Sequence, residues 1–187
     1  RSGYSENGST GENYTIKARD PYGNTSVIWE ARENDVGSNA DGGWNGDYYS
    51  IDKSKKYRFV YFMKMPRGGG NNGISLNGTL YMGLHANSSN LHHYNGTASQ
   101  SNPYFTYPGS VIGSLSQNRW YMGVFFVLPD GTGANAGLED GIGVYDMRDG
   151  AQATAFNPSN GNLGRQGYWG SSATSTRTRN YLYYSTT

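Results

Sequence analysis

Hydrophobic and polar residues alternate over several short stretches of this chain. Tyr57–Lys64 is dense in aromatic and β-branched residues, a composition that suits a pleated, half-buried strand. In residues 26–31 (SVIWEA), Val27, Trp29 and Ala31 fall on one face of a two-residue period. Both stretches are therefore predicted to be strands.

Five further strands are predicted from the same kind of pattern: Tyr14–Ala18, Thr79–His85, Arg119–Leu128, Gly141–Met147 and Arg179–Ser185. Turn sequences such as Asp20-Pro21-Tyr22-Gly23-Asn24 separate them, because Pro presets one dihedral and Gly or Asn accepts the left-handed region. No stretch shows a convincing helical period. The pattern predicts an all-β fold.

Composition supports this prediction and bounds the domain organisation. Only 35% of the 187 residues are hydrophobic, while the chain holds 28 glycines and 17 tyrosines. Such a mixture favours many short strands joined by glycine-rich turns over a helical bundle. We expect a flexible lead-in at residues 1–13 and one β-sandwich domain at residues 14–187.

Charge and cysteine content exclude several classes of function. The net charge is +1 and no basic block exists, so no nucleic-acid partner is expected. No apolar run approaches the roughly 20 residues of a membrane-spanning helix, so no membrane insertion is expected either. The chain has no cysteine, which excludes disulfides and cysteine-ligated zinc.

Taken in order, several pieces of the sequence resemble the jelly-roll layout of carbohydrate-binding modules in the galactose-binding-like style. The matching pieces are Trp29, Gly43-Trp44-Asn45, Ile51-Asp52, Lys55–Phe59, Leu80–Leu84, Asn118–Tyr121, Val124–Pro129 and Tyr181–Tyr184. Residues 40–45 (ADGGWN) together with the tyrosine-rich tail also look like domains at the tips of phage tail fibres and bacterial surface adhesins. The resemblance implies a single jelly-roll β-sandwich of antiparallel strands with long loops. Because most of the matching pieces maintain the fold, the resemblance predicts the architecture more than it predicts the ligand.

A loop rich in oxygen ligands is predicted before the long strand at Tyr57. It offers Glu33, Asp35, Asn39, Asp41 and Asp47 within fifteen positions. Calcium takes six to eight oxygen ligands, and modules of the resembled kind often hold a structural calcium ion. An ordinary turn stabilised by Asx hydrogen bonds would show the same residues. Both interpretations stay open at this point.

Aromatic residues in or beside the predicted loops are candidates for sugar binding, because the apolar face of a pyranose stacks on a ring. The candidate ligand-binding residues are Trp44, Tyr94, Tyr104, Arg165, Gln166, Tyr168 and Trp169. Arg165 and Gln166 would serve as hydroxyl partners. Tyr168 and Trp169 lie in a Gly/Asn-rich stretch and are expected to be exposed, whereas burial is favoured for Trp44.

Catalysis is a weaker alternative. A polysaccharide lyase needs a base, an acid and a group that neutralises a uronate, and His93 with Tyr94 has the right chemistry for the first two. No lyase signature surrounds that pair, and a solvated loop in which polar and aromatic residues happen to adjoin is the favoured explanation. A carboxylate pair for glycoside hydrolysis stays open, since such pairs assemble from different strands.

The sequence thus favours non-catalytic recognition of a polysaccharide or cell-surface glycan by an adhesin or tail-fibre-like protein, supported by calcium. The expected location is extracellular or on a cell or virion surface. A structural subunit of a fibre or shell is a third reading, because a resembled module would add one more strand after the tyrosine-rich tail. Self-association or neighbouring domains of a longer chain are the further partners expected.

Overall fold

A computed structural model describes residues 3–7, 11–31, 40–64, 78–85, 91–93, 104–106, 115–116, 118–133, 136–154 and 166–184. Fourteen strands run through these residues, and the described part of the chain contains no helix. The predicted all-β class is confirmed.

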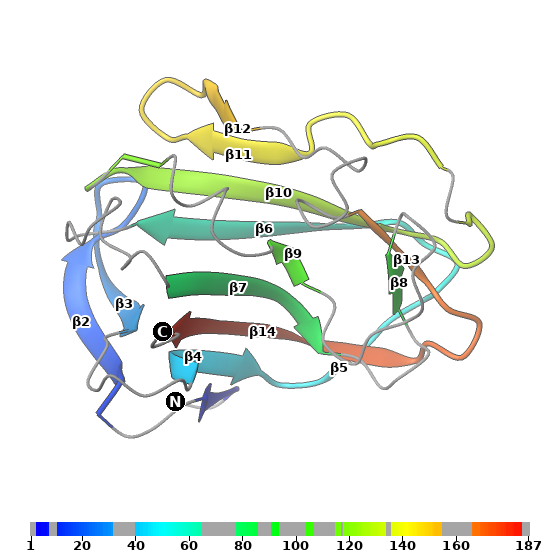
Figure 1. Ribbon diagram of the computed structural model, residues 1–187, viewed down its shortest axis with the longest axis horizontal. Coiled ribbons are helices and arrows are strands. Elements are labelled where there is room, and N and C mark those ends of the chain that lie inside the picture. The colour runs from blue at the N-terminus through cyan, green and yellow to red at the C-terminus, as the bar shows by residue number, and fades with distance from the viewer. Residues whose placement is uncertain are drawn as a thin grey trace.

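The first sheet has six strands. Its order is β1 (Tyr4–Asn7), β4 (Ala40–Gly46), β14 (Ser175–Tyr184), β7 (Gly78–His85) and β9 (Tyr104–Thr106), and β5 (Tyr49–Ser50) pairs with the start of β14. Every neighbouring pair is antiparallel. The last strand in sequence therefore lies in the middle of the sheet (Figure 1).

The second sheet also has six strands. Its order is β12 (Gln152–Thr154), β11 (Gly143–Asp146), β10 (Trp120–Leu128), β13 (Gly167–Trp169) and β8 (Leu91–His93), and β6 (Tyr57–Lys64) pairs antiparallel with β10. Only the short pairing of β10 with β13 is parallel. Because β10 is bonded to β6 on one side and to β11 and β13 on the other, it is the central strand of this sheet.

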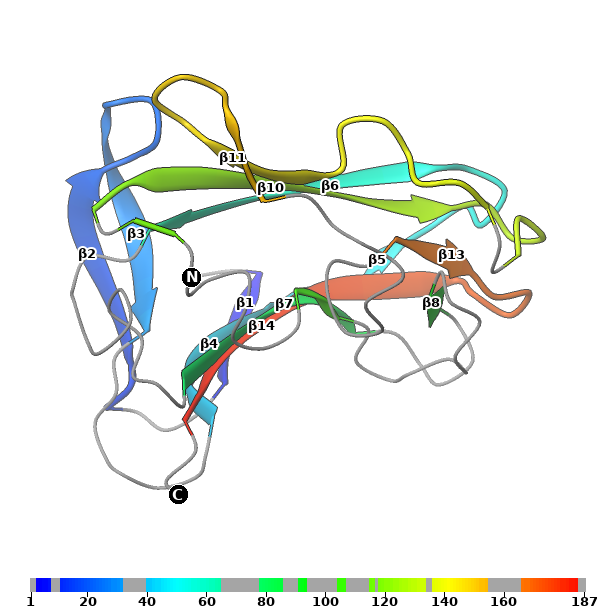
Figure 2. The ribbon, with the colours of Figure 1, turned by 45° about the horizontal axis from the view of Figure 1, so that its top comes forward.

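A hairpin of β2 (Asn13–Arg19) and β3 (Thr25–Ala31) spans the two sheets at one end (Figure 2). On the side of the first sheet, the rings of Trp29 and Trp44 meet edge to face with centroids 6.1 Å apart. On the side of the second sheet, the Trp120 Nε1–H donates to the Arg19 carbonyl at 3.0 Å. The hairpin is thereby attached to both layers.

Strand alternation decides which side chains form the core. In β6, Tyr61 and Met63 are buried while Val60 and Phe62 are exposed, as a two-residue period requires. The remaining buried apolar residues between the sheets come from both layers: Met82, Leu84, Leu91, Phe105, Leu115, Tyr121, Phe125, Val127, Ile142, Val144, Trp169 and Ala173. Val124 and Phe126 are also buried, but they share the outer side of β10 with their exposed register partners Val60 and Arg58. The two sheets therefore face each other as the layers of a β-sandwich-like fold.

Two contacts tie the layers together at the centre. Phe105 of the first sheet stacks on Phe125 of the second, with ring centroids 4.8 Å apart and planes 13° apart. The buried Tyr61 hydroxyl of β6 donates to the Gly83 carbonyl of β7 at 2.9 Å. Burial raises the pKa of the Tyr61 phenol, which keeps it a neutral donor.

The structure confirms the predicted strands and adds others. Tyr57–Lys64 is a strand with the expected limits, and the other six predicted strands overlap β2, β3, β7, β10, β11 and β14. The predicted flexible lead-in is wrong at residues 4–7, which form β1 against β4. The predicted loop at residues 33–47 is likewise a strand from residue 40 to 46, because backbone pairing with β1 and β14 outweighs the low strand propensity of its glycines.

Gly123 provides a test of this packing. A Cβ at this position would lie 2.7 Å from Phe125 Cε2 and 2.9 Å from Cζ, and the Phe125 ring is fully buried and cannot move aside freely. We expect Gly123→Ala to lower the free energy of unfolding by about 1–3 kcal/mol through overpacking, measured by urea denaturation.

Gly137→Ala is the matched control. A Cβ there meets nothing within 4 Å, so its free energy of unfolding should stay within roughly 0.5 kcal/mol of the parent. Equal effects of the two substitutions would contradict the packing described for Phe125.

Candidate functional site

The outer face of the second sheet carries a row of apolar side chains across three strands. Phe62 of β6 pairs in register with Met122 of β10, and Met122 pairs with Tyr145 of β11. Two residues from Phe62 on the same face of β6, Val60 pairs with Val124. Phe62 and Val60 are about 40% exposed, with relative exposures of 39% and 41%. These residues form an apolar surface that faces away from the core.

An open groove of about 430 Å³ lies on this surface. Its floor is apolar and consists of Met122, Val124 and Phe126. Its rim includes the charged residues Arg58 and Asp140. The volume lies within the roughly 300–1,000 Å³ of small-molecule sites, and an apolar floor with a few polar groups is their usual composition.

Two aromatic residues are held in place at this face. The Tyr145 hydroxyl donates to the Gly141 carbonyl at 2.8 Å, and both residues line the groove. At the tip of the β2–β3 hairpin, Tyr22 meets Phe62 edge to face with centroids 5.7 Å apart. Tyr22 is 69% exposed. Ring surface is therefore available both within the groove and beside it.

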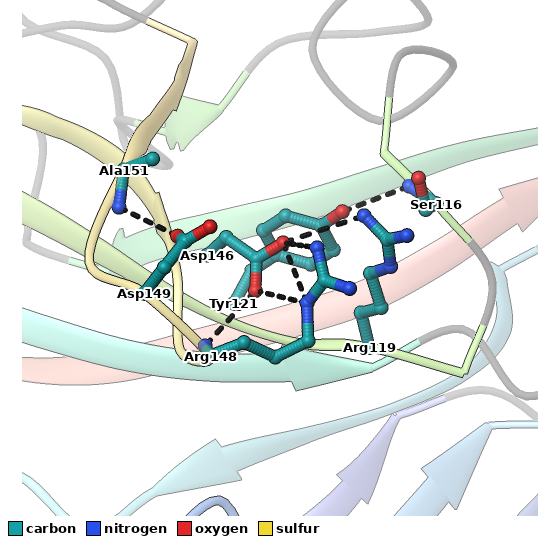
Figure 3. Close-up of polar contacts among 7 residues, drawn as sticks. All are labelled: Ser116, Arg119, Tyr121, Asp146, Arg148, Asp149 and Ala151. Carbon is teal, nitrogen blue, oxygen red and sulfur yellow. Dashed lines mark hydrogen bonds and ion pairs between the residues drawn. The ribbon is translucent and has the colours of Figure 1, made fainter.

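A cluster of charged groups lies at the end of β11 (Figure 3). Asp146 has a side chain only 8% exposed, and Arg148 holds it with Nη2 2.8 Å and Nε 3.1 Å from its carboxylate oxygens. The backbone N–H of Arg148 also donates to Oδ1 at 3.0 Å, and Arg119 Nη1 lies 3.5 Å from Oδ2. The hydrogen bonds from Arg148 and the neighbouring positive charges hold the pKa of the Asp146 carboxyl below its usual range.

This cluster limits what the groove can do chemically. Asp146 contributes to the lining of the groove, but its carboxylate is ionised and bonded to Arg148 and Arg119. Asp140 is the second carboxylate residue of the lining. Glycoside hydrolysis needs one carboxyl that is protonated and one that is free to act as base or nucleophile. Asp146 is ionised and therefore does not suit the role of the protonated acid.

Two of the residues predicted to contact a ligand are buried instead. Trp169 is completely buried, and its ring packs edge to face on Tyr57 at 5.6 Å. Gln166 is 1% exposed; its Nε2 donates to the Gly137 carbonyl, and its Oε1 accepts from the Glu139 N–H. The expected exposure of Trp169 is wrong because Gly167–Trp169 is a strand, β13, whose alternation points this ring inward.

Two other predicted residues lie at or near the surface. The half-buried ring of Tyr168 stacks on His92, with centroids 5.0 Å apart and planes 16° apart. Trp44 is half-buried and meets Tyr4 edge to face at 5.0 Å. Neither is brought to the groove lining. Among the described side chains, Trp44 and Tyr168 therefore do not contribute to the groove.

The remaining predicted ligand-binding and catalytic residues are described in part or not at all. Tyr94 and Arg165 lie outside the described residues. Tyr104 and His93 lie in β9 and β8, where His93 pairs in register with Gly167. The proposed lyase pair of His93 and Tyr94 stays a prediction.

The predicted calcium ligands cannot all hold one ion. Glu33, Asp35 and Asn39 lie outside the described residues. Asp41 lies near the start of β4 and Asp47 just past its end, six strand steps or roughly 20 Å apart. Ligands 2.3–2.6 Å from a common ion lie within about 5 Å of one another, so at most one of these two can take part. Among the residues that the structure describes, no three His, Asp or Glu side chains are grouped as metal ligands would be.

The groove residues were missed by sequence reasoning for a definite reason. Met122, Val124 and Phe126 belong to a nearly continuous apolar run, which hides that alternate residues face outward. The register of β10 with β6 and β11 supplies that information. A usable signal was the alternation in β6, where Arg58, Val60 and Phe62 share one face.

Comparison with known proteins adds no family: no protein-family model, curated protein or solved structure matches this chain.

Asp146 gives a test of the charged cluster. Its folded-state pKa is lowered, so its ionised form stabilises the fold above the unfolded-state pKa of about 3.9, and this contribution is lost as the pH falls through the lower folded-state pKa. We expect Asp146→Asn to lower the free energy of unfolding at pH 7, with a difference from the parent that shrinks below about pH 4. Urea unfolding at pH 7, 5 and 3 measures it. A difference that is the same at all three values would contradict the ion-pair contribution.

Proposed function

We propose that this chain is a non-catalytic recognition domain that binds a glycan on the outer face of its second sheet. One observation carries the proposal: the groove joins an apolar floor to a ring fixed by its own hydrogen bond and to charged groups on the rim. A pyranose presents the matching surface, with C–H groups on its faces and hydroxyls around its edge. The apolar face would lie on Met122 and Tyr145, and the hydroxyls would bond to Arg58 and Asp140.

The exposed residues beside the groove extend this surface. Phe62, Val60 and Tyr22 continue the apolar row beyond the groove, over β6 and the hairpin tip. A surface longer than the groove suits a chain of sugars better than a single one. Aromatic rings are the usual apolar platform for such contacts.

The proposed class is a jelly-roll recognition domain of an adhesin or tail-fibre-like protein, acting outside the cell or on a virion surface. Two facing sheets of mostly antiparallel strands support that architecture. In this proposal, a calcium ion would be held by Glu33, Asp35, Asn39 and Asp41, without Asp47. β14 lies between β4 and β7 and is not an edge strand of the first sheet. A structural subunit of a fibre or shell stays a prediction.

A glycan array with the parent protein, run with calcium and again with a chelator, tests the function. We expect a defined set of oligosaccharides to bind, and we expect chelation to weaken binding if Glu33, Asp35, Asn39 and Asp41 hold a calcium ion. Absence of binding to every glycan in both conditions would overturn the proposal. Binding unchanged by the chelator would remove calcium from it and leave the groove in place.

Substitutions then locate the site. With the best glycan from the array, we expect Tyr145→Ala and Phe62→Ala each to weaken binding about tenfold, the loss of one stacking ring, measured by calorimetry. Tyr4→Ala is the matched control, because Tyr4 is an exposed tyrosine of the first sheet, 57% exposed. Equal losses in Tyr4→Ala and Tyr145→Ala would place the site elsewhere.

A further inference from the structure

Two exposed charges of opposite sign line the groove on the second sheet. Arg58 comes from β6, and Asp140 comes from the turn that leads into β11. Within the part of the chain that the structure describes, neither side chain forms an ion pair or a hydrogen bond with the protein. Both charges are therefore accessible to a ligand that lies in the groove.

The two charges lie on opposite sides of the groove floor. β6, β10 and β11 run side by side with β10 in the middle (Figure 1). Arg58 pairs in register with Phe126, which places it on the β6 side of the floor. Val124 pairs with Gly143, which follows the turn that carries Asp140, so this carboxylate lies on the β11 side. Two inter-strand steps, roughly 10 Å, separate the two sides.

The next charges along the same two sides do pair with each other. Lys56, two residues before Arg58, has its Nζ 2.5 Å from Oε2 of Glu139, the residue before Asp140. This ion pair reaches from the β6 side to the β11 side. Lys56 and Glu139 do not line the groove, whereas Arg58 and Asp140 do and form no such pair. The groove thus keeps one cation and one anion apart across an open floor.

The turn that carries Asp140 is fixed on both sides of this residue. Before it, the Glu139 backbone N–H donates to the buried Gln166 Oε1 at 2.8 Å. After it, the Gly141 carbonyl accepts from the Tyr145 hydroxyl at 2.8 Å. The opposite charge is carried by β6, which pairs with β10 along its whole length. Because both backbones are already ordered, little conformational entropy is lost there on binding.

The third charged residue of the lining does not change this balance. The Asp146 carboxylate accepts hydrogen bonds from Arg148, and Arg119 Nη1 lies 3.5 Å from it. Its charge is compensated within the protein. The charges that the groove offers to a ligand are therefore one guanidinium and one carboxylate.

We propose that the groove selects a zwitterionic stretch of glycan, in which a uronic acid lies next to an amino sugar whose amine is free. The uronate carboxylate accepts hydrogen bonds from the Arg58 guanidinium, whose planar fork matches it. The ammonium group of the amino sugar donates to Asp140, and the sugar faces lie on Met122 and Tyr145. Groups on adjacent sugar units suit the separation of the two charges. This inference rests on the proposed glycan function and names the ligand class of the same site.

Calorimetry with four forms of one tetrasaccharide tests the inference. Glucuronic acid and glucosamine alternate in it, the amines are free or N-acetylated, and the carboxylates are free or methyl esters. We expect the zwitterion to bind most strongly, and masking of either kind of charge to weaken binding about tenfold. General attraction to the protein, whose net charge is +1, would instead favour the N-acetylated acid.

Substitutions assign each charge of the ligand to one residue. In Arg58→Gln, the acid and its methyl ester should bind equally, while the preference for the free amine remains. In Asp140→Asn, the free and N-acetylated amines should bind equally, while the preference for the free carboxylate remains. This crossed pattern isolates the two pairwise contacts from other effects of each substitution. Urea unfolding of both variants checks that any loss arises in a folded protein.

Two matched controls make the same changes in net charge away from the groove. Lys17→Gln lies at an exposed position of β2 and Glu6→Gln at an exposed position of β1, and both should leave the order of the four probes unchanged. The inference is overturned if no form binds, if either groove variant keeps both preferences, or if a control loses one.

The fully masked, neutral form separates this inference from the proposed function. If it binds as strongly as the zwitterion and Tyr145→Ala weakens that binding, the charge selection is overturned and the glycan groove stands. A glycan array without any binding overturns the proposed function itself.

Discussion

The contact on which the structure depends is the stacking of Phe105 on Phe125 between the two sheets, with the Tyr61 hydroxyl bonded to Gly83 beside it. A chain without cysteine cannot join its layers covalently, and with only 35% hydrophobic residues it has few aliphatic side chains to spare. Large rings fill the space between layers with few residues. The hydroxyl bond adds a directional constraint, since a buried phenol must find an acceptor.

The orientation of the core also determines both outer faces. Because strand neighbours alternate, fixing Phe125 inward fixes Val124 and Phe126 outward on β10. In the same way the burial of Thr176 and Asn180 on β14 turns Arg177 and Arg179 to the outside. Each sheet thus takes the chemistry of its outer face from its central strand. One face is apolar with a charged rim, and the other is cationic.

The sequence was sufficient where alternation was regular and insufficient where pairing with distant strands decided the outcome. Tyr57–Lys64 could be predicted with its limits because its residues alternate and a polar turn precedes it. The glycine-rich β4 and the three-residue β13 carry no such pattern; they are strands because β14 and β10 lie beside them. Trp169 was expected at the surface because its neighbours in sequence are loop-like. It is buried because β13 pairs with β10 and β8. The groove could not be predicted, since it is defined by cross-strand partners such as Phe62 and Met122.

The central position of β14 has a consequence for how the molecule assembles. This strand is the last in the chain, yet β4 and β7 pair with it along most of their lengths and not with each other. During synthesis, the first sheet must wait for β14 before its two halves can join. Until then β4 and β7 carry backbone groups that lack their final partners, and the pairing that completes them closes a loop across most of the chain. Such non-local closure is entropically costly and slow. The step in which β14 inserts is therefore expected to limit the folding rate, and the period before it is when the chain is most exposed to wrong strand pairing.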